Sequence, residues 1–282
     1  MAGLLEALST QELVRNGFIA GLLASVACGV VGSYVVTRRI SYIAGAIAHC
    51  VLGGMGAAWY LRTAHGWTSL HPIHGAVVAA LTGAAIIGLV SLRTRERADT
   101  VIGAVWAIGM AVGLVFIQAS PRYPPDLMSY LFADILTVSG GHLRLIAGLD
   151  VVVVAVGLLF YNQFVAVCFD EEFARVRGVR VEAYYLLLLG LTALTVVLLV
   201  TVVGIVMVIA LLTLPAAVAG RFSRTLWQMM ILATLLCMGF TTGGLALSYG
   251  PDLPASATII LLAGATYLLV ALGAAVLRRR GA

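Results

Sequence analysis

Long apolar runs alternate with short polar stretches along almost the whole chain. A helix of roughly 20 apolar residues is long enough to cross the hydrocarbon core of a bilayer, so each run predicts a membrane-spanning helix. The fold class that follows is an all-α polytopic membrane protein, a bundle of 8–9 transmembrane helices. Seven of the predicted spans are Phe18–Val36, Ile43–Leu61, Ile73–Leu92, Val101–Ala119, Leu143–Val167, Leu226–Leu247 and Ser256–Leu277.

The apolar segment Ala183–Ala219 is longer than one span requires. Its 37 residues would form a helix of roughly 55 Å, whereas the hydrocarbon core is only about 30 Å thick. Arg180 and Arg221 flank its two ends, so we expect the segment to cross the membrane twice. Val203–Gly204 is the predicted break, because glycine tolerates a tight turn. The total is nine spans, or eight if one of this pair is only partly inserted.

Arginine is distributed unequally between the two sets of loops. Thirteen arginines fall in one set of loops and at the carboxyl end, and the other set holds only Arg15, Arg62, Arg122 and Arg144. Because positive charge is retained on the cytoplasmic side, the first set is predicted to be cytoplasmic and the amino terminus to lie outside. The segment Leu127–Val138 is too short to span, and we expect a re-entrant or interfacial helix on the outer side.

Composition leaves no room for a soluble domain. Of the 282 residues, 62% are hydrophobic and only 10% are charged, so the chain cannot cover a water-facing surface. We expect a single transmembrane domain over residues 1–282 and no nucleic-acid partner. Cys28, Cys50, Cys168 and Cys237 have neither a paired nor a metal-type spacing. The chain contains no lysine, so it lacks the Gly-rich loop and Lys that hold the phosphates of ATP.

The longest charged run lies between two spans, in the stretch 168–183. Asp170 can cap a short helix whose first turn holds Glu171 and Glu172, and Gly178 suits its end. A short charged helix on the cytoplasmic side predicts a docking element for another protein. A solvated loop is the alternative.

Phe173 is the expected anchor of this docking element. It is the single aromatic residue within the polar stretch Asp170–Arg177, and an exposed aromatic side chain is a natural contact for a partner. Ala174 and Gly178 are four residues apart, and their small size is predicted to let the helix lie close to that partner.

One face of the second predicted span combines small residues with an imidazole. Gly45, His49, Gly53 and Gly56 follow one another at helical spacing. Such glycines let a second backbone approach or line a narrow path, and an ionisable group inside a membrane usually faces a cavity or a partner. We therefore predict His49 as a transient metal ligand on a translocation path lined by these glycines. The alternative is a structural histidine that hydrogen-bonds a neighbouring backbone group.

Other polar side chains near the membrane are weaker candidates for functional residues. His65, His71 and His74 lie in one outer loop and could pass on a metal ion, although three histidines in a polar loop are more often only solvated. Asp150 is expected to have a structural role near the outer interface.

Several sequence stretches are distinctive in combination. They lie within Thr37–Gly54 (TRRISY, GAIAH, LGG), Asp99–Gly103 (DTVIG), Asp126–Leu136 (DLMSYLFADIL), Phe169–Val179 (FDEEFARVRGV) and Leu211–Thr225 (LLTLPAAVAGRFSRT). Together they resemble the membrane subunit of ATP-binding-cassette (ABC) importers for zinc, manganese or iron. The resemblance covers nearly the whole chain, with the stretches in the family's order.

The resemblance implies a permease in the inner (plasma) membrane of a prokaryote, without a bound cofactor and without enzymatic activity of its own. It also implies a homodimer or a pair of similar permeases, with two separate ATPase subunits on the inner side. An extracytoplasmic metal-binding protein would deliver the ion. In the family, the helix that follows Asp170 docks in a groove of the ATPase.

One departure from the family bears on the substrate. Zinc and manganese members often carry Gly-Asp four residues before the histidine of the second span, where this chain has Ala44 and Gly45. Zinc accepts imidazole well, whereas manganese prefers carboxylate oxygen, so His49 without the carboxylate favours zinc over manganese or iron. A metal chelate remains an alternative substrate.

The sequence argues against two other classes of membrane protein. A secondary transporter driven by an ion gradient would need charged or broken helices near the midplane, and the few intramembrane carboxylates argue against it. A membrane-embedded hydrolase would need a cluster such as HExxH or GxSxG, and the chain contains neither.

Overall fold

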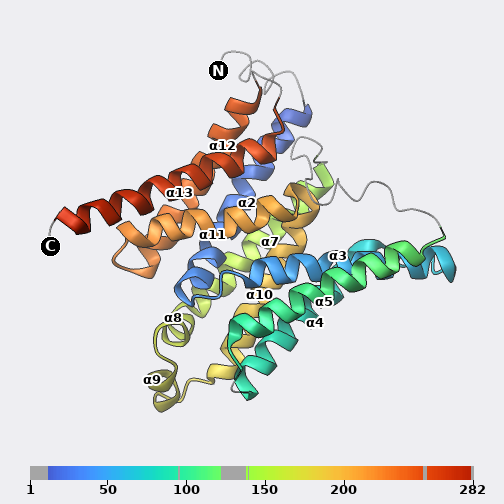
Figure 1. Ribbon diagram of the computed structural model, residues 1–282, viewed down its shortest axis with the longest axis horizontal. Helices are drawn as coiled ribbons and strands as arrows, with labels where there is room; N and C mark the ends of the chain where they lie inside the picture. The colour runs from blue at the N-terminus through green and yellow to red at the C-terminus, as the bar shows by residue number, and fades with distance from the viewer. Residues whose placement is uncertain (1–11, 95, 122–137, 139, 250–252, 281–282) are drawn as a thin grey trace.

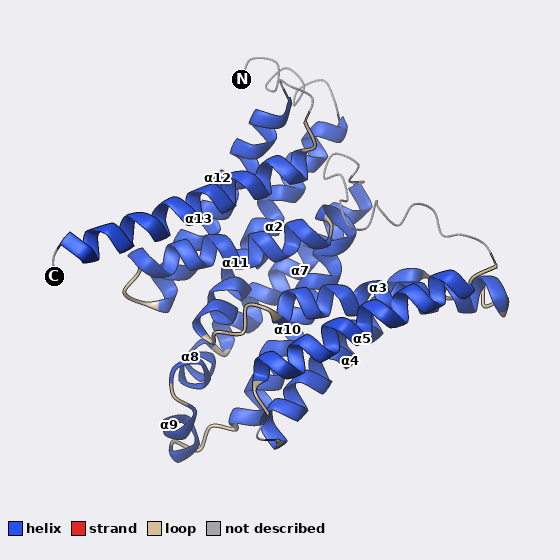
Figure 2. Ribbon diagram, in the orientation of Figure 1, coloured by secondary structure: helices blue, strands red, loops and turns tan. Residues whose placement is uncertain are grey.

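The computed structural model describes residues 12–94, 96–121, 138, 140–249 and 253–280. Every regular element in these ranges is an α-helix, which confirms the predicted class (Figure 1, Figure 2). The helices are α2 (Glu12–Thr37), α3 (Ile43–Ala64), α4 (Pro72–Arg93), α5 (Ala98–Ala119), α7 (Gly140–Leu159), α8 (Tyr161–Phe169), α9 (Glu171–Val176), α10 (Val181–Val203), α11 (Ile205–Phe222), α12 (Leu226–Tyr249) and α13 (Ala255–Arg280). Eight of those described are long and apolar enough to cross a membrane, and the bent pair α7–α8 would supply a ninth crossing.

The helices form two groups connected by α10. In the first group, α3 packs against both α4 and α5. In the second, α2 contacts α7, α11 and α12, and α13 packs on α11 and α12. The first group lies at the lower right of Figure 1 and the second at the upper left, with α10 between them in contact with members of both. This arrangement leaves the short helix α9 at one edge of the bundle.

The predicted break in the long apolar segment is confirmed. α10 ends at Val203 and α11 begins at Ile205, and both helices qualify as separate spans. Gly204 between them has φ 82° and ψ 161°, a backbone conformation that is essentially restricted to glycine. The break between α10 and α11 therefore depends on glycine, which has no side chain, at position 204.

The predicted span Leu143–Val167 is broken into two helices. α7 and α8 meet at a bend of 72°, so the choice between eight and nine spans concerns this pair and not the 183–219 segment. Phe164 of α8 is fully buried with its ring centroid 5.1 Å from that of Tyr34. The Tyr34 hydroxyl donates a hydrogen bond to the Gly157 carbonyl at 3.0 Å, just before the bend. A side chain that satisfies a backbone carbonyl in this way stabilises an interruption of the helix.

The bent pair is best understood as one crossing. Arg38 lies directly after α2 and pairs with Glu171 of α9, so the two loops that carry them lie on the same side of the bundle. The three spans α3, α4 and α5 intervene between those loops, and the chain therefore needs one more crossing to return. The short helix predicted over Leu127–Val138 lies, except for Val138, outside the described residues.

We expect Gly204→Ala to destabilise the protein by about 1–3 kcal/mol, because alanine must adopt a strained backbone conformation there. Thermal unfolding of the purified protein in detergent measures the effect. Gly190→Ala is the matched control, because a Cβ at Gly190, inside α10, meets no atom within 4 Å. Alanine favours a helix interior, so this control should keep or slightly raise the melting temperature. Equal melting temperatures of Gly204→Ala and Gly190→Ala would contradict the requirement for glycine at position 204.

Candidate functional site

The charged stretch forms the predicted helix. Asp170 caps α9, since its carboxylate accepts a hydrogen bond from the Phe173 N–H at 2.9 Å. Glu171 and Glu172 occupy the first turn, where the helix dipole favours negative charge. Gly178 follows the helix with φ 77°, a left-handed conformation that glycine adopts at low cost. The local structure is thus confirmed, while docking of α9 to another protein stays a prediction.

α9 has one buried and one exposed side. Ala174 is fully buried in the chain's own core, where it packs α9 against the bundle. The expectation that Ala174 faces a partner protein is therefore wrong. Phe173 and Val176 are 53% and 87% exposed. The Arg177 guanidinium lies 5.1 Å from the centroid of the Phe173 ring. At Gly178, a Cβ would meet no atom within 4 Å. The surface open to another protein therefore combines apolar side chains with charges.

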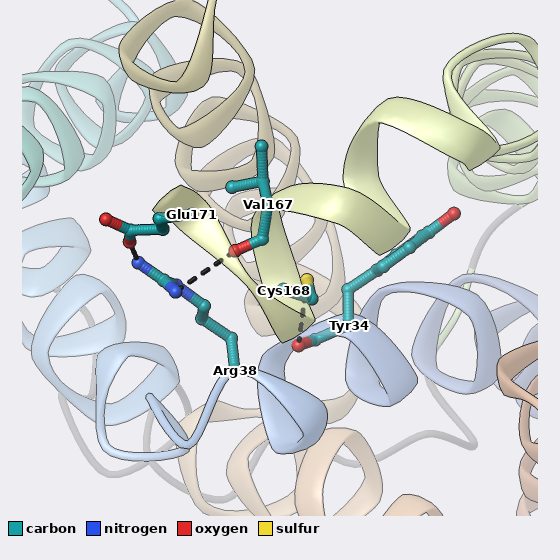
Figure 3. A network of polar contacts seen from close by, with 5 residues as sticks. All are labelled: Tyr34, Arg38, Val167, Cys168 and Glu171. Carbon is teal, nitrogen blue, oxygen red and sulfur yellow. Dashed lines mark hydrogen bonds and ion pairs between the residues drawn. The ribbon is translucent and has the colours of Figure 1, made fainter. Parts of the chain in front are cut away.

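One arginine ties α9 to the bundle. Figure 3 shows Arg38 reaching from the end of α2 to an ion pair with Glu171 and to the Val167 carbonyl, to which it donates a hydrogen bond of 3.0 Å. Its guanidinium also lies 5.1 Å from the centroid of the Tyr185 ring. Arg38 thus contacts α8, α9 and α10 together. The sequence indicated only that this residue carries inside charge, because its partner is far along the chain.

His49 of α3 has a defined hydrogen bond. Its Nδ1 atom lies 2.8 Å from the Gly45 carbonyl oxygen, which can only accept. Nδ1 therefore donates, and in the neutral ring Nε2 keeps its lone pair. The half-buried ring stacks on Trp106 of α5, with 4.7 Å between centroids. The backbone hydrogen bond is the one expected of a structural histidine, yet it leaves free the nitrogen that a metal ion would need.

The glycines on the same face of α3 contact α5. A Cβ at Gly45 would lie 2.5 Å from the ring of Trp106. Cβ atoms at Gly53 and Gly56 would lie 2.6 Å and 2.9 Å from the carbonyl oxygens of Gly109 and Gly113. The two backbones thus touch in this conformation, as expected of a face of small residues. A path along these glycines stays a prediction, and it would require α3 and α5 to separate.

The outer histidines have structural contacts. The His71 Nδ1 accepts a hydrogen bond from the Ile73 N–H, and the His74 Nδ1 accepts one from the His71 N–H, so both rings help to cap α4. The His65 ring packs on Tyr60 with 5.6 Å between centroids. Among the described residues, no group of three or more His, Cys, Asp or Glu side chains is arranged to hold a metal ion.

Asp150 of α7 is an acidic side chain inside the described bundle. Only 6% of the residue is exposed, and neither carboxylate oxygen has a hydrogen-bond partner among the described residues. The structural role expected for Asp150 is therefore not evident from its contacts.

Comparisons with known proteins agree on one kind of protein. A family model described as the ABC 3 transport family matches residues 10–274. A "Probable metal transport system membrane protein" of Chlamydia pneumoniae is 38% identical over 251 residues, which cover 89% of this chain and 85% of that protein. The "Manganese import system permease protein ScaB" of Streptococcus parasanguinis is 28% identical over 265 residues, covering 94% of this chain and 92% of that protein.

A solved structure extends the similarity to the fold. In "PsaBC from Streptococcus pneumoniae in complex with Fab", one chain superposes with a TM-score of 0.81 at 28% sequence identity. The match covers 95% of this chain and 94% of that chain. The helical arrangement therefore matches that of the solved protein over nearly its full length.

We expect Arg38→Gln to loosen α9 while leaving the bundle folded. The variant loses the Glu171 pair, which is partly exposed and worth about 1 kcal/mol or less, and weakens a charged hydrogen bond to Val167 worth about 1.5–3 kcal/mol. Hydrogen–deuterium exchange measures the effect, as faster exchange of the amides in residues 170–178. Arg39→Gln is the control, because Arg39 is an exposed neighbour outside this network. Unchanged amide exchange of residues 170–178 in Arg38→Gln would contradict the role of Arg38 in holding α9 on the bundle.

Proposed function

The chain belongs to the ABC 3 transport family, and from this premise we propose that it is the permease subunit of an ABC importer for a divalent transition metal. It is a transport subunit and not an enzyme. The observation that carries the proposal is α9, a seated helix with exposed apolar and charged side chains at the arginine-rich side of an apolar bundle. Such a helix offers a separate, water-soluble motor protein a place to bind.

The partners proposed are two ATPase subunits, a second copy of the permease and an extracytoplasmic metal-binding protein. A separate ATPase is supported by the absence of lysine from the chain, since a phosphate-binding loop of the usual kind requires one. The predicted cytoplasmic side of the permease carries most of the arginines and α9. The ATPase would bind there, and the metal-binding protein would approach the opposite side.

Coupling would run through Arg38. The ATPase would grip the exposed side of α9, and Arg38 connects α9 to the end of α2 and to Tyr185 of α10. α2 in turn packs on α7, α11 and α12, while α10 packs on α3 and α4. A displacement of α9 would therefore reach both helix groups through packed elements, without passing along a flexible loop.

The metal path is proposed to run past His49. In a homodimer, the α3 helices of two copies near the axis would bring two Nε2 atoms together, and two neutral imidazoles with water can hold a divalent ion briefly. Weak binding suits transport, because the ion must also leave. The contact between α3 and α5 at Gly53 and Gly56 describes a closed path, which separation of these helices would open.

The ligand chemistry and the names of the relatives favour different metals. A site that offers imidazole without a carboxylate suits zinc, and Trp106 fills the space beside Gly45 where a carboxylate would stand. The relative named as a manganese import permease makes manganese the second candidate. Uptake of zinc, manganese and iron into proteoliposomes, with the complete importer reconstituted, distinguishes them. We expect transport to depend on the metal-binding protein and zinc to be preferred.

We expect Phe173→Ala to weaken binding of the ATPase and to reduce metal-stimulated ATP hydrolysis several-fold without unfolding the permease. The reason is that Phe173 is an exposed aromatic anchor, and such anchors carry about 2 kcal/mol or more at an interface. Co-purification of the ATPase and ATP hydrolysis in proteoliposomes are the measurements. Trp67→Ala is the control, an exposed aromatic on the predicted outer side. Normal assembly and normal transport by Phe173→Ala would refute the docking role.

We expect His49→Ala to lower metal uptake at least ten-fold while assembly and basal ATP hydrolysis stay intact. His49 is the proposed ligand, and the removed ring leaves only glycines on its face of α3. His65→Ala is the matched histidine control, because that exposed outer residue should tolerate the change. If His49→Ala transports normally, the residue is a structural histidine and the path assignment fails.

Restoring the carboxylate extends this test to selectivity. Gly45→Asp alone would drive its Cβ into Trp106, so the informative variant is Gly45→Asp combined with Trp106→Ala. This double variant should shift uptake from zinc towards manganese, because manganese prefers oxygen ligands. Trp106→Ala alone is the reference, and an unchanged metal preference would contradict the proposed role of position 45.

A further inference from the structure

A cavity of about 1030 Å³ opens at the predicted cytoplasmic side between α2, α8, α11, α12 and α13. Its rim is formed by the α11–α12 connection, and its walls come from α2, α12 and α13. The α11–α12 connection and the carboxyl-terminal half of α13 lie at the left of Figure 1, away from α3, α4 and α5. The cavity is therefore separate from the surroundings of His49.

The rim carries positive charge without a counter-charge. Arg221 and Arg224 are exposed, and neither forms an ion pair or a side-chain hydrogen bond among the described residues. Among the described residues, no Asp or Glu lines the cavity. Both guanidinium groups line the same cavity, so an anion bound there would be attracted by two positive charges.

A neutral hydrogen-bond donor at the rim also suits an anionic ligand. The Thr225 hydroxyl oxygen accepts a hydrogen bond from the Gln228 N–H, which leaves the hydroxyl proton free to donate. Tyr267 of α13 also lines the cavity, deeper within the span. The rim stands at the first turn of the long helix α12, where the dipole favours negative charge.

The inner part of the cavity is apolar. Its walls include Met229 of α12, with Val270, Gly273 and Ala274 of α13, all within membrane-spanning helices. Most of α13 is exposed, so this wall faces the hydrocarbon region. A polar rim at one end of a span, above an apolar slot along that span, matches the headgroup and acyl chain of a phospholipid.

We propose that this cavity binds an anionic phospholipid of the inner leaflet. Arg221 and Arg224 hold its phosphate, with Thr225 as a further donor, and an acyl chain lies along α13. Basic pockets between transmembrane helices on the cytoplasmic side are suited to anionic headgroups. A free phosphate would leave the apolar slot unfilled, and an acidic protein surface could not enter a wall within the membrane.

The test uses the purified full-length permease, stripped of lipid in detergent and titrated with fluorescent phosphatidylglycerol or with phosphatidylcholine of the same acyl chains. The wild type should prefer phosphatidylglycerol. Arg221→Gln with Arg224→Gln should weaken that binding by about five-fold for each arginine removed. Arg93→Gln with Arg97→Gln is the matched control, because it removes the same charge from an exposed loop predicted to lie on the same side.

Gly273→Leu tests the slot separately. A Cβ there meets no atom within 4 Å, so the leucine should fold normally and occupy the acyl-chain space. It should lower phosphatidylglycerol binding while leaving the arginines in place.

Four results would overturn the proposal. The first is equal binding of the two lipids, and the second is an equal loss of phosphatidylglycerol binding in the Arg93 and Arg97 control variant. The third is full displacement of the lipid by inorganic phosphate at equal concentration. The fourth is unchanged lipid binding by the Arg221 and Arg224 variant together with loss of ATPase binding. The last result would assign the cavity to a protein partner.

Discussion

The hydrocarbon core of a bilayer tolerates neither unpaired backbone groups nor unpaired charges, and most of this structure follows from that constraint. The described backbone satisfies itself within helices, and the described charges lie in the connections or near helix ends, with Asp150 inside α7 as the exception. The stretch that carries the most charge becomes α9, because Asp170 caps it and Ala174 seats it on the bundle. Arg38 then joins this helix to α2, so a water-exposed element is held firmly by membrane-embedded ones.

The same constraint shapes the surroundings of His49. An imidazole among apolar helices requires a polar partner, and the Gly45 carbonyl one turn earlier supplies it. Glycines at Gly53 and Gly56 let α5 approach until backbones touch, which closes the face of α3. Around Gly53 and Gly56 the contact is between backbones, so separation of α3 and α5 would mainly require the Trp106 ring to leave His49. If a metal path runs past His49 as we propose, this conformation would be its closed state, with the Nε2 lone pair available.

The sequence predicted what depends on local rules. Span positions followed from apolar length, the reversal at Gly204 from glycine's backbone freedom, and the start of α9 from the capping chemistry of Asp170. What it could not predict depends on contacts between distant segments. The bend before α8 rests on Tyr34 and Phe164, which belong to different helices. Similarly, neither the Arg38–Glu171 pair nor the position of Trp106 beside Gly45 has a signature in local pattern.

We propose that the ATPase grips the permease at α9. Site-specific photo-cross-linking tests it most directly, with a benzophenone reagent attached to Val176→Cys in the complete complex. The four native cysteines are buried, so the introduced thiol should be labelled selectively. We expect a cross-link from position 176 to the ATPase and none from Thr68→Cys in the α3–α4 connection on the opposite side. An active complex that gives no ATPase cross-link from position 176, or an equal one from position 68, would contradict it.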